Sequence, residues 1–224
     1  MAFADNYVLP EELSTGGIAG IIDSFIKAAE RALKAGFRIV EIHCAHGYLL
    51  HEFLSPIANQ RTDMYGGSFE NRVRFPLEVV RAVRGVWPQH LPVFIRISAT
   101  DWLEPHGWDL KQSVALAQIV KKEGIDLVDC SSGGIVPYAK IPAGPGYQVT
   151  FSETIHKEVD IMTGAVGIIT SAMQAETILA SGQASVIVIA RQFLRDPYWP
   201  LHAAAELRQD IQWPSQYHRA SPNP

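Results

Sequence analysis

Two histidines and a tyrosine stand close together in the segment His43–Tyr48. Imidazole N–H groups and a phenol O–H can donate hydrogen bonds to a substrate oxygen, and they can also transfer a proton. A metal site is the other chemistry open to a histidine pair, but His43 and His46 lack a third ligand at any recognisable spacing. The nearby His51–Glu52 pair begins a zinc-protease pattern, yet Ser55 stands where that pattern needs its second histidine. The segment therefore indicates a hydrogen-bonding and proton-donating site, and no metal is expected.

A single arginine, Arg96, interrupts the apolar run from Val93 to Ile97. A guanidinium inside a strand needs an anionic partner, because burying an unpaired charge is costly. A bound anionic cofactor could fill that role. A structural ion network of Glu41, Arg96 and Asp129 could also fill it, and the residues alone leave both alternatives open.

Glycines and an arginine stand at the ends of the last two expected strands. Gly164 and Gly167 end one of them, and Arg191 stands 24 residues after Gly167 at the end of the next. Exposed backbone N–H groups, together with an arginine that forms paired hydrogen bonds to oxygen, are suited to a phosphate group. These segments predict a phosphate site, although the glycines could equally serve a tight turn.

A repeating strand–helix pattern carries these residues. Apolar residues at three- and four-residue spacing predict helices, and short β-rich runs predict strands. Glycine closes three of the expected helices just before a strand, at Gly36, Gly124 and Gly182. The expected helices span 18–33, 70–86, 110–123, 151–158 and 172–181, with a last one after Pro197. The expected strands are 37–43, 93–98, 125–131, a brief one ending at 163–167, and 184–189.

Alternating helices and strands predict a parallel sheet in an α/β fold, either an open doubly wound sheet or a (β/α)8 barrel. Glu41 and His43 share one face of the first strand, and the next two strands carry polar pairs in the same way. An open sheet covered by helices on both faces offers such groups no polar surroundings, whereas the upper interior of a barrel meets the active site. We therefore expect a (β/α)8 TIM barrel of which this chain holds the last five β/α units. One domain over 1–224 is expected, with a tail, 212–224, that leaves the barrel.

Composition excludes several classes of protein. The 224 residues, 47% hydrophobic and 19% charged, can bury a substantial core and are unlike a disordered chain. A net charge of −4 without a Lys/Arg run argues against nucleic acid or a membrane surface as a partner. No apolar run could span a bilayer, and no secretory leader is visible. Two cysteines, Cys44 and Cys130, without metal or disulfide spacing suit a reducing compartment, so a cytoplasmic location is expected.

Longer motifs closely resemble the Old Yellow Enzyme family of FMN-dependent ene-reductases, in particular its thermophilic-like, bacterial-type branch. The resemblance implies an oxidoreductase that takes a hydride from NADPH or NADH through FMN. The hydride would pass to the activated C=C bond of an α,β-unsaturated carbonyl or nitro compound. Dienoyl-CoA reductases are a related flavin barrel, but they need an iron–sulfur cysteine cluster that two cysteines cannot supply. The segments that carry the resemblance are 41–50, 53–56, 59–68, 70–72, 74–75, 94–99, 129–134, 163–167, 194–197 and 216–217, together with Arg219.

The resemblance also implies roles for the candidate site residues. His43 and His46 match the pair that holds the carbonyl or nitro oxygen of the substrate, and Tyr48 matches the phenol that protonates the α-carbon. Arg96 matches an arginine near the pyrimidine end of the flavin, where it favours negative charge on the reduced ring.

Further positions match the phosphate site and a subunit contact of that family. Gly167, Ala190 and Arg191 correspond to the phosphate-binding positions, and Ala190 replaces a glycine often found there without removing the backbone N–H. Arg219 corresponds to a tail arginine that enters the site of a neighbouring subunit, which implies a homo-oligomer.

The chain departs from the family at its start. A barrel has eight strands, and the five expected here correspond to the last five, so the three strands that support the flavin ring would precede this sequence. The chain is then either part of a longer ene-reductase, or a truncated chain that is non-catalytic or depends on a complementary piece. The sequence leaves both alternatives open.

Overall fold

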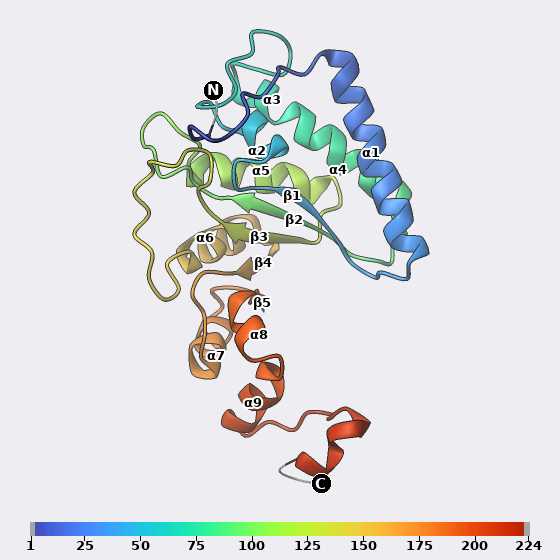
Figure 1. Cartoon of the computed structure of the whole chain (residues 1–224), viewed down its shortest axis with the longest axis vertical. Coiled ribbons are helices and arrows are strands. Elements are labelled where there is room, and N and C mark those ends of the chain that lie inside the picture. Colours follow the sequence, from blue (N-terminus) through green and yellow to red (C-terminus); the bar gives the residue numbers. More distant parts are fainter. Residues whose placement is uncertain (1–2, 222–224) are drawn as a thin grey trace.

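The computed structural model describes residues 3–221, and its strands form one parallel sheet in the order of the sequence (Figure 1). Each strand is connected to the next through one or more helices, as in a series of β/α units. The strands are β1 (Val40–Cys44), β2 (Val93–Ser98), β3 (Leu127–Ser131), β4 (Met162–Ala165) and β5 (Val186–Ile187). The helices are α1 (Thr15–Lys34), α2 (Leu49–Leu54), α3 (Phe69–Arg72), α4 (Arg74–Val86), α5 (Leu110–Lys122), α6 (Val149–Val159), α7 (Ala172–Ala180), α8 (Arg191–Arg195) and α9 (Trp199–Glu206), followed by the 3-10 helix η1 (Ser215–Ala220).

Local signals set the ends of several elements. The Ser14 side chain accepts a hydrogen bond from the Gly17 N–H at 3.0 Å and so caps the start of α1. Gly36, Gly124 and Gly182 have φ angles of 90°, 88° and 69°, in the left-handed region that favours glycine. The predicted glycine endings of these three helices are confirmed.

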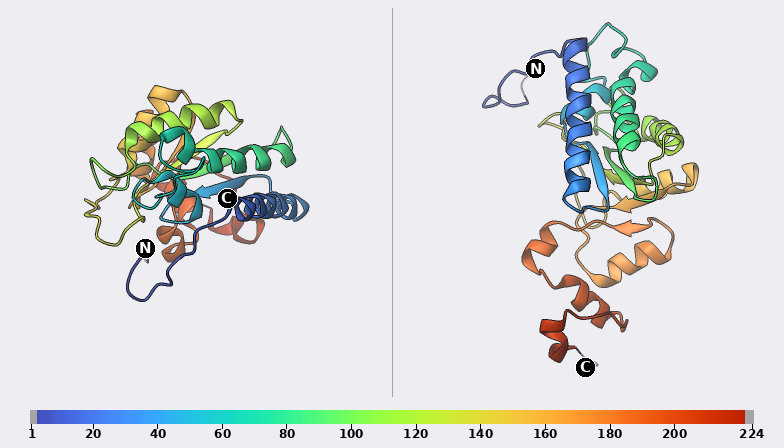
Figure 2. Two further views of the ribbon diagram at one scale, coloured as in Figure 1. Left: turned by 90° about the horizontal axis from the view of Figure 1, so that it is seen from above. Right: turned by 90° about the vertical axis from the view of Figure 1, so that its right-hand side faces the viewer.

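One face of the sheet packs against helices. Ile42, Ile95 and Val128 lie in register on β1, β2 and β3, and each is at most 3% exposed. They belong to one apolar cluster with Val80 of α4 and Leu116 of α5. Helices α1, α4, α5 and α6 follow one another in an arc along the sheet (Figure 2). Because helices cover this face, the polar residues that alternate with the apolar ones along β1 and β2 must point the other way.

The predicted series of five β/α units is confirmed, whereas the short helices α2, α8 and η1 were not predicted and two predicted elements differ in extent. A single helix over 70–86 is wrong: α3 ends before Val73 and α4 begins after it. Pro76 has no N–H to donate to the Arg72 carbonyl, which interrupts the helical ladder at this point. The last strand is reduced to Val186–Ile187, since it pairs with β4 alone and β4 itself ends at Ala165.

The C-terminal part of the chain forms a smaller unit. A second apolar cluster joins Ala165 of β4 to Ala175 and Ile178 of α7, with Trp199 packed against it. Helices α8 and α9 and η1 extend away from the sheet (Figures 1 and 2). Residues 212–221 lie outside the sheet, and residues 222–224 of the predicted tail lie outside the described residues. The exit of the tail 212–224 from a barrel and the extent of the domain stay predictions. No helix within residues 3–221 is long and apolar enough to cross a membrane.

The unequal size of the two apolar clusters predicts unequal local stability. Amide hydrogen exchange should be slowest in β1–β3 and at least about a hundredfold faster in β5, because opening β5 exposes little apolar surface. Exchange measured by mass spectrometry on the native chain checks this. Equal protection of Ile95 and Ile187 would contradict it.

Candidate active site

A polar row crosses the sheet close to the carboxyl ends of its strands. His43 of β1 is in register with Arg96 of β2, Arg96 with Asp129 of β3, and Asp129 with Gly164 of β4. Residues in register on neighbouring parallel strands point to the same face. The predicted polar face is thus confirmed. It ends at a glycine where an added Cβ would lie 3.5 Å from the Asp129 Cα.

An ion pair lies within this row. The Arg96 Nε is 3.2 Å from the Asp129 Oδ2, with Asp129 1% exposed and the Arg96 side chain 23% exposed. Glu41 is exposed and forms no ion pair with Arg96 in the described chain. Of the predicted network, Arg96 and Asp129 are in direct contact, whereas Glu41 acts on both at longer range: burial raises the pKa of Glu41 while Arg96 lowers it, and Glu41 adds to the rise that burial causes in the pKa of Asp129.

The Asp129 carboxylate is short of hydrogen-bond donors. Among the described residues, neither of its oxygens accepts a hydrogen bond. Burial raises the pKa of Asp129 to about 7, even though the neighbouring Arg96 lowers it. At neutral pH the carboxyl group is consequently close to its titration midpoint.

A left-handed turn after β1 brings the His46 side chain close to His43. His46 and Gly47 have φ angles of 60° and 74°. The His46 N–H donates to the Ser98 Oγ at 2.9 Å, and its Nε2 lies 2.6 Å from the Ser131 Oγ. A Cβ on Gly47 would lie 2.1 Å from the Gly134 carbonyl oxygen, so the two loops touch backbone to backbone. Strands β2 and β3 thereby fix the loop that follows β1.

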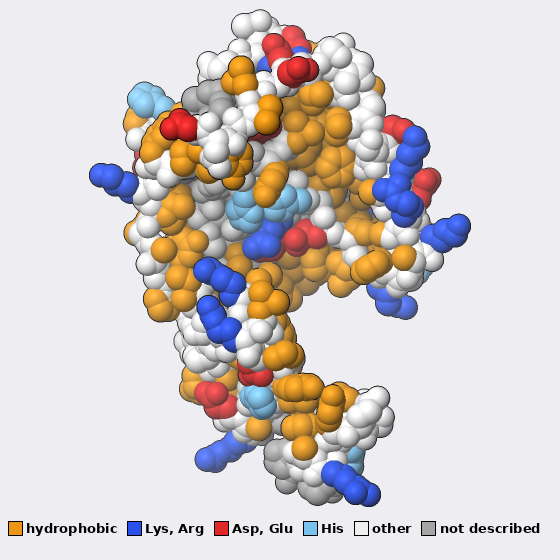
Figure 3. Space-filling view, in the orientation of Figure 1, with side chains coloured by type: hydrophobic (Ala, Val, Ile, Leu, Met, Phe, Trp, Pro, Cys, Tyr) orange, Lys and Arg blue, Asp and Glu red, His pale blue; other side chains and the backbone are white. Residues whose placement is uncertain are grey.

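Both imidazoles are neutral at physiological pH. Burial, with a further contribution from Arg96, lowers the pKa of His46 to about 4, and the same causes lower the pKa of His43. Each neutral ring keeps one N–H donor. The rings of His43 and His46, and those of His43 and Tyr48, have centroids 5.3 Å apart, while Tyr48 is 65% exposed. Figure 3 shows His side chains gathered beside basic and acidic groups on one open face.

The segments predicted to bind phosphate follow adjacent strands. Gly167 comes after β4 with a φ of 128°, and Ala190 and Arg191 stand after β5 at the start of α8. A Cβ on Gly167 would lie 3.0 Å from Tyr147 and from Gln148, so glycine is needed there for space as well as for its backbone angle. Arg191 is exposed. Both segments lie after the carboxyl ends of adjacent strands, which is compatible with a phosphate site. The phosphate site itself stays a prediction.

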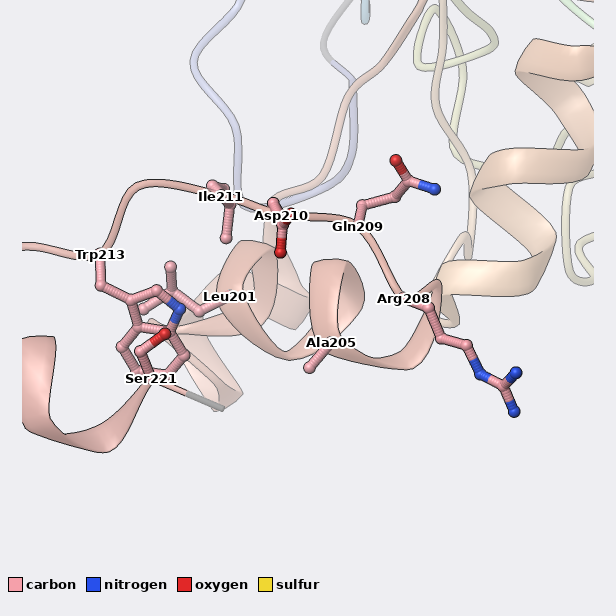
Figure 4. A pocket seen from close by; sticks show the side chains of 8 residues that line it. All are labelled: Leu201, Ala205, Arg208, Gln209, Asp210, Ile211, Trp213 and Ser221. Carbon is pink, nitrogen blue, oxygen red and sulfur yellow. The ribbon is translucent and has the colours of Figure 1, made fainter. Parts of the chain in front are cut away.

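Arg219 is not brought to the polar row of the same chain. It lies in η1, which is distant from β1–β3 (Figure 1). Its predicted role in a neighbouring subunit stays a prediction. A separate hollow lies by α9 (Figure 4), lined by Leu201, Ala205, Arg208, Gln209, Asp210, Ile211, Trp213 and Ser221.

Sequence reasoning missed two buried residues behind the turn. His51 Nδ1 accepts a hydrogen bond from the Gly47 N–H at 2.9 Å, and His51 Nε2 lies 2.9 Å from Asp101 Oδ1. The available signal was the spacing of His51 four residues after Gly47 on a short helix, which the zinc-protease pattern obscured. Among the described residues, no group of three His, Cys, Asp or Glu side chains could hold a metal ion.

The chain matches a known protein family over most of its length. A sequence model of the NADH:flavin oxidoreductase / NADH oxidase family matches residues 2–210. The chain belongs to this family. The NADPH dehydrogenase of Halalkalibacterium halodurans is 51% identical over 216 residues, which cover 96% of this chain and 63% of that protein. The NADPH dehydrogenase of Bacillus subtilis is 47% identical over 219 residues, covering 98% of this chain and 64% of that protein. The chain thus spans slightly less than two thirds of these relatives.

Solved structures of flavin reductases have the same fold. Morphinone reductase superposes with a TM-score of 0.74 at 31% identity, over 93% of this chain and 54% of that one. A 2-naphthoyl-CoA reductase complex superposes with a TM-score of 0.84 at 26% identity, over 93% of this chain and 32% of that one. The family membership expected from the sequence motifs is confirmed.

The raised pKa of Asp129 predicts an unusual dependence of stability on pH. A carboxyl with a folded pKa of about 7 and an ordinary value near 3.8 binds more protons in the folded state, so its contribution to stability falls as the pH rises between these values. Asp129→Asn removes this loss. The free energy of unfolding of the variant, relative to the parent chain, should increase by about 2–3 kcal/mol from pH 5 to pH 8. Urea unfolding at both pH values measures it.

The exposed Asp160, whose carboxylate lies 3.4 Å from the Lys121 Nζ, provides the control for this prediction, because exposed ion pairs contribute little to stability. Asp160→Asn should show the same stability relative to the parent chain at both pH values. A difference for Asp129→Asn that does not change with pH would contradict the prediction.

Proposed function

We propose that this chain is part of an FMN-dependent oxidoreductase that transfers a hydride from NADPH or NADH to an activated C=C bond. The substrates would be small α,β-unsaturated carbonyl or nitro compounds. The main support is the row of His43, Arg96 and Asp129 at the carboxyl ends of the sheet, where neutral imidazoles lie beside a guanidinium. The family description names a flavin and NADH, and the relatives named NADPH dehydrogenase favour NADPH.

The residues of this face fit a flavin. The buried Arg96 Nε lies 3.2 Å from the Asp129 Oδ2 but makes no hydrogen bond among the described residues, so a carbonyl or ring nitrogen of the isoalloxazine could accept from this N–H. Gly164 leaves the sheet without a side chain beside Asp129. Gly167, Ala190 and Arg191 would bind the phosphate through backbone N–H groups and a guanidinium. When bound, FMN would accept a hydride from the nicotinamide and donate it to the alkene.

The protein's own groups would prepare the substrate for this hydride. Neutral N–H donors of His43 and His46 would bind the carbonyl or nitro oxygen, where negative charge builds as the β-carbon is reduced. Each neutral imidazole can donate its one N–H to this oxygen while the ring stays uncharged. The exposed Tyr48 hydroxyl would then protonate the α-carbon.

A second candidate is a chain that needs a complementary piece before it binds flavin. The open edges of β1 and β5 favour it, since each of these strands pairs on one side only among the described residues. Unpaired strand edges bind other strands readily. A homo-oligomer in which Arg219 enters the neighbouring site, and a cytoplasmic location, stay proposals of the same kind.

Flavin binding separates the two candidates. The purified chain is titrated with FMN while its visible spectrum and fluorescence are followed, and NADPH oxidation is then measured with 2-cyclohexenone. Saturable binding with enone-dependent NADPH oxidation supports the ene-reductase. A chain that binds no FMN, alone or at high concentration, would show that this chain by itself is not the enzyme.

Tyr48→Phe should slow reduction of the enone by about a hundredfold, because the proton donor is lost. Reduction of the flavin by NADPH should be unchanged. Stopped-flow absorbance measures the two half-reactions separately. Tyr138→Phe, at another exposed tyrosine, is the control and should leave both rates unaltered. Equal loss of both half-reactions in Tyr48→Phe would exclude the donor role.

Arg191→Ala should weaken FMN binding by about tenfold or more, because a charge-assisted hydrogen bond to phosphate is lost. Riboflavin, which lacks the phosphate, should bind the variant and the parent chain equally. Arg195→Ala, at the other end of α8, is the matched control. An FMN affinity unchanged in Arg191→Ala would remove this residue from the phosphate site.

A further inference from the structure

A buried chain of polar groups lies behind the turn that carries His46. His51 of α2 and Asp101, from the loop after β2, are both 0% exposed. The Asp101 Oδ2 accepts hydrogen bonds from the Ser55 hydroxyl at 2.6 Å and from the Trp108 N–H at 2.7 Å. The Asp101 Oδ1 lies 2.9 Å from the His51 Nε2, within ion-pair distance, although the two atoms are not aligned as a hydrogen bond. Two donors thus hold the carboxylate in place and leave one oxygen for the imidazole.

This arrangement selects one tautomer of His51. Its Nδ1 accepts the Gly47 N–H and therefore carries no proton, so the neutral ring has its proton on Nε2, facing Asp101. A carboxylate can only accept in this position. The pair behaves like the carboxylate–histidine partners that fix ring orientation behind other sites.

The backbone group that His51 holds is in a strained position. Gly47 and His46 both have left-handed φ angles, and the His46 side chain makes this conformation unfavourable. Contacts with Ser98 and Gly134 hold the turn from one side. On the other side, the bond from Gly47 to His51 is the described contact that holds its backbone N–H.

We propose that His51, oriented by Asp101, is a positioning residue for the substrate-oxygen site. It keeps the His46–Gly47 turn left-handed and thereby sets the direction of the His46 imidazole and of the Tyr48 hydroxyl that follows. The proposal rests on the proposed function for its consequence in catalysis. Its structural part, the tautomer and the turn, can be tested without that function.

Asp101→Asn is the sharpest test because it keeps the shape and reverses the hydrogen bonding. The oxygen of the new amide would accept from Ser55 and Trp108, so the amide nitrogen would face His51 and donate to Nε2. The His51 proton would then move to Nδ1, where it opposes the Gly47 N–H. The ring nitrogen shifts of His51 should show the other tautomer, and exchange of the Gly47 amide should speed up at least about tenfold, both by NMR.

Two substitutions of His51 separate its contact with the Gly47 N–H from its contact with Asp101. Asparagine places its oxygen near the former Nδ1, so His51→Asn should keep the Gly47 amide protected. Glutamine reaches toward Asp101 without that acceptor, so His51→Gln should lose the protection. Ser152→Ala, which removes a buried hydroxyl in α6, is the control for general loss of stability and should not change Gly47.

The activity readout follows once the parent chain reduces an enone. The KM for 2-cyclohexenone should rise about tenfold in Asp101→Asn and His51→Gln, with flavin reduction by NADPH unchanged and His51→Asn close to the parent. An unchanged His51 tautomer and Gly47 exchange rate in Asp101→Asn would overturn the proposal, whether or not the chain is active. A perturbed turn with an unchanged KM would overturn the positioning role and leave the proposed function intact.

Discussion

Everything described at this site depends on the register of three parallel strands. Because β1, β2 and β3 pair without a shift, His43, Arg96 and Asp129 fall into one row on one face. The residues between them fall into the apolar row that packs against helices. A slip of one residue would exchange the two rows and bury charged groups against α4 and α5. Helix packing therefore determines where the chemistry can lie.

Arg96 is the electrostatic centre of the site. Its charge lies beside Asp129 and near both histidines, and it lowers the pKa of all three groups, which disfavours the charged form of the histidines and favours the charged form of Asp129. It lowers the pKa of His43 and His46, which burial already lowers, and it partly offsets the effect of burial on Asp129. One fixed cation thus adds to the effect of burial in keeping both imidazoles uncharged, while it stabilises its own counterion. A flavin whose reduced ring carries negative charge would find the same cation within its site.

The sequence allowed the strand–helix order, the helix-ending glycines and the polar face to be predicted, because each depends on local periodicity. The break between α3 and α4 at Val73 was not predicted. Pro76 causes it through the hydrogen bond that the Arg72 carbonyl lacks, and the apolar spacing along 70–86 does not show this effect. The sequence also could not reveal the His51–Asp101 pair. The two residues are 50 positions apart, and only the folding of the loop after β2 brings them to 2.9 Å. The proposed phosphate contacts of Gly167, Ala190 and Arg191 and the proposed subunit role of Arg219 depend on molecules that the sequence does not contain.

The close approach of Gly47 to Gly134 has a consequence for how this site could diversify. The first glycine follows β1 and the second follows β3, and a side chain on either would overlap the backbone of the other loop. Neither loop can change in length or acquire a bulkier residue here unless the other changes with it. Substitutions that reshape this region would therefore be tolerated more readily elsewhere, as at Gly144, where an added Cβ would meet nothing within 4 Å. The contact between Gly47 and Gly134 is therefore a fixed part of the site, and a change of specificity would have to come from residues outside it.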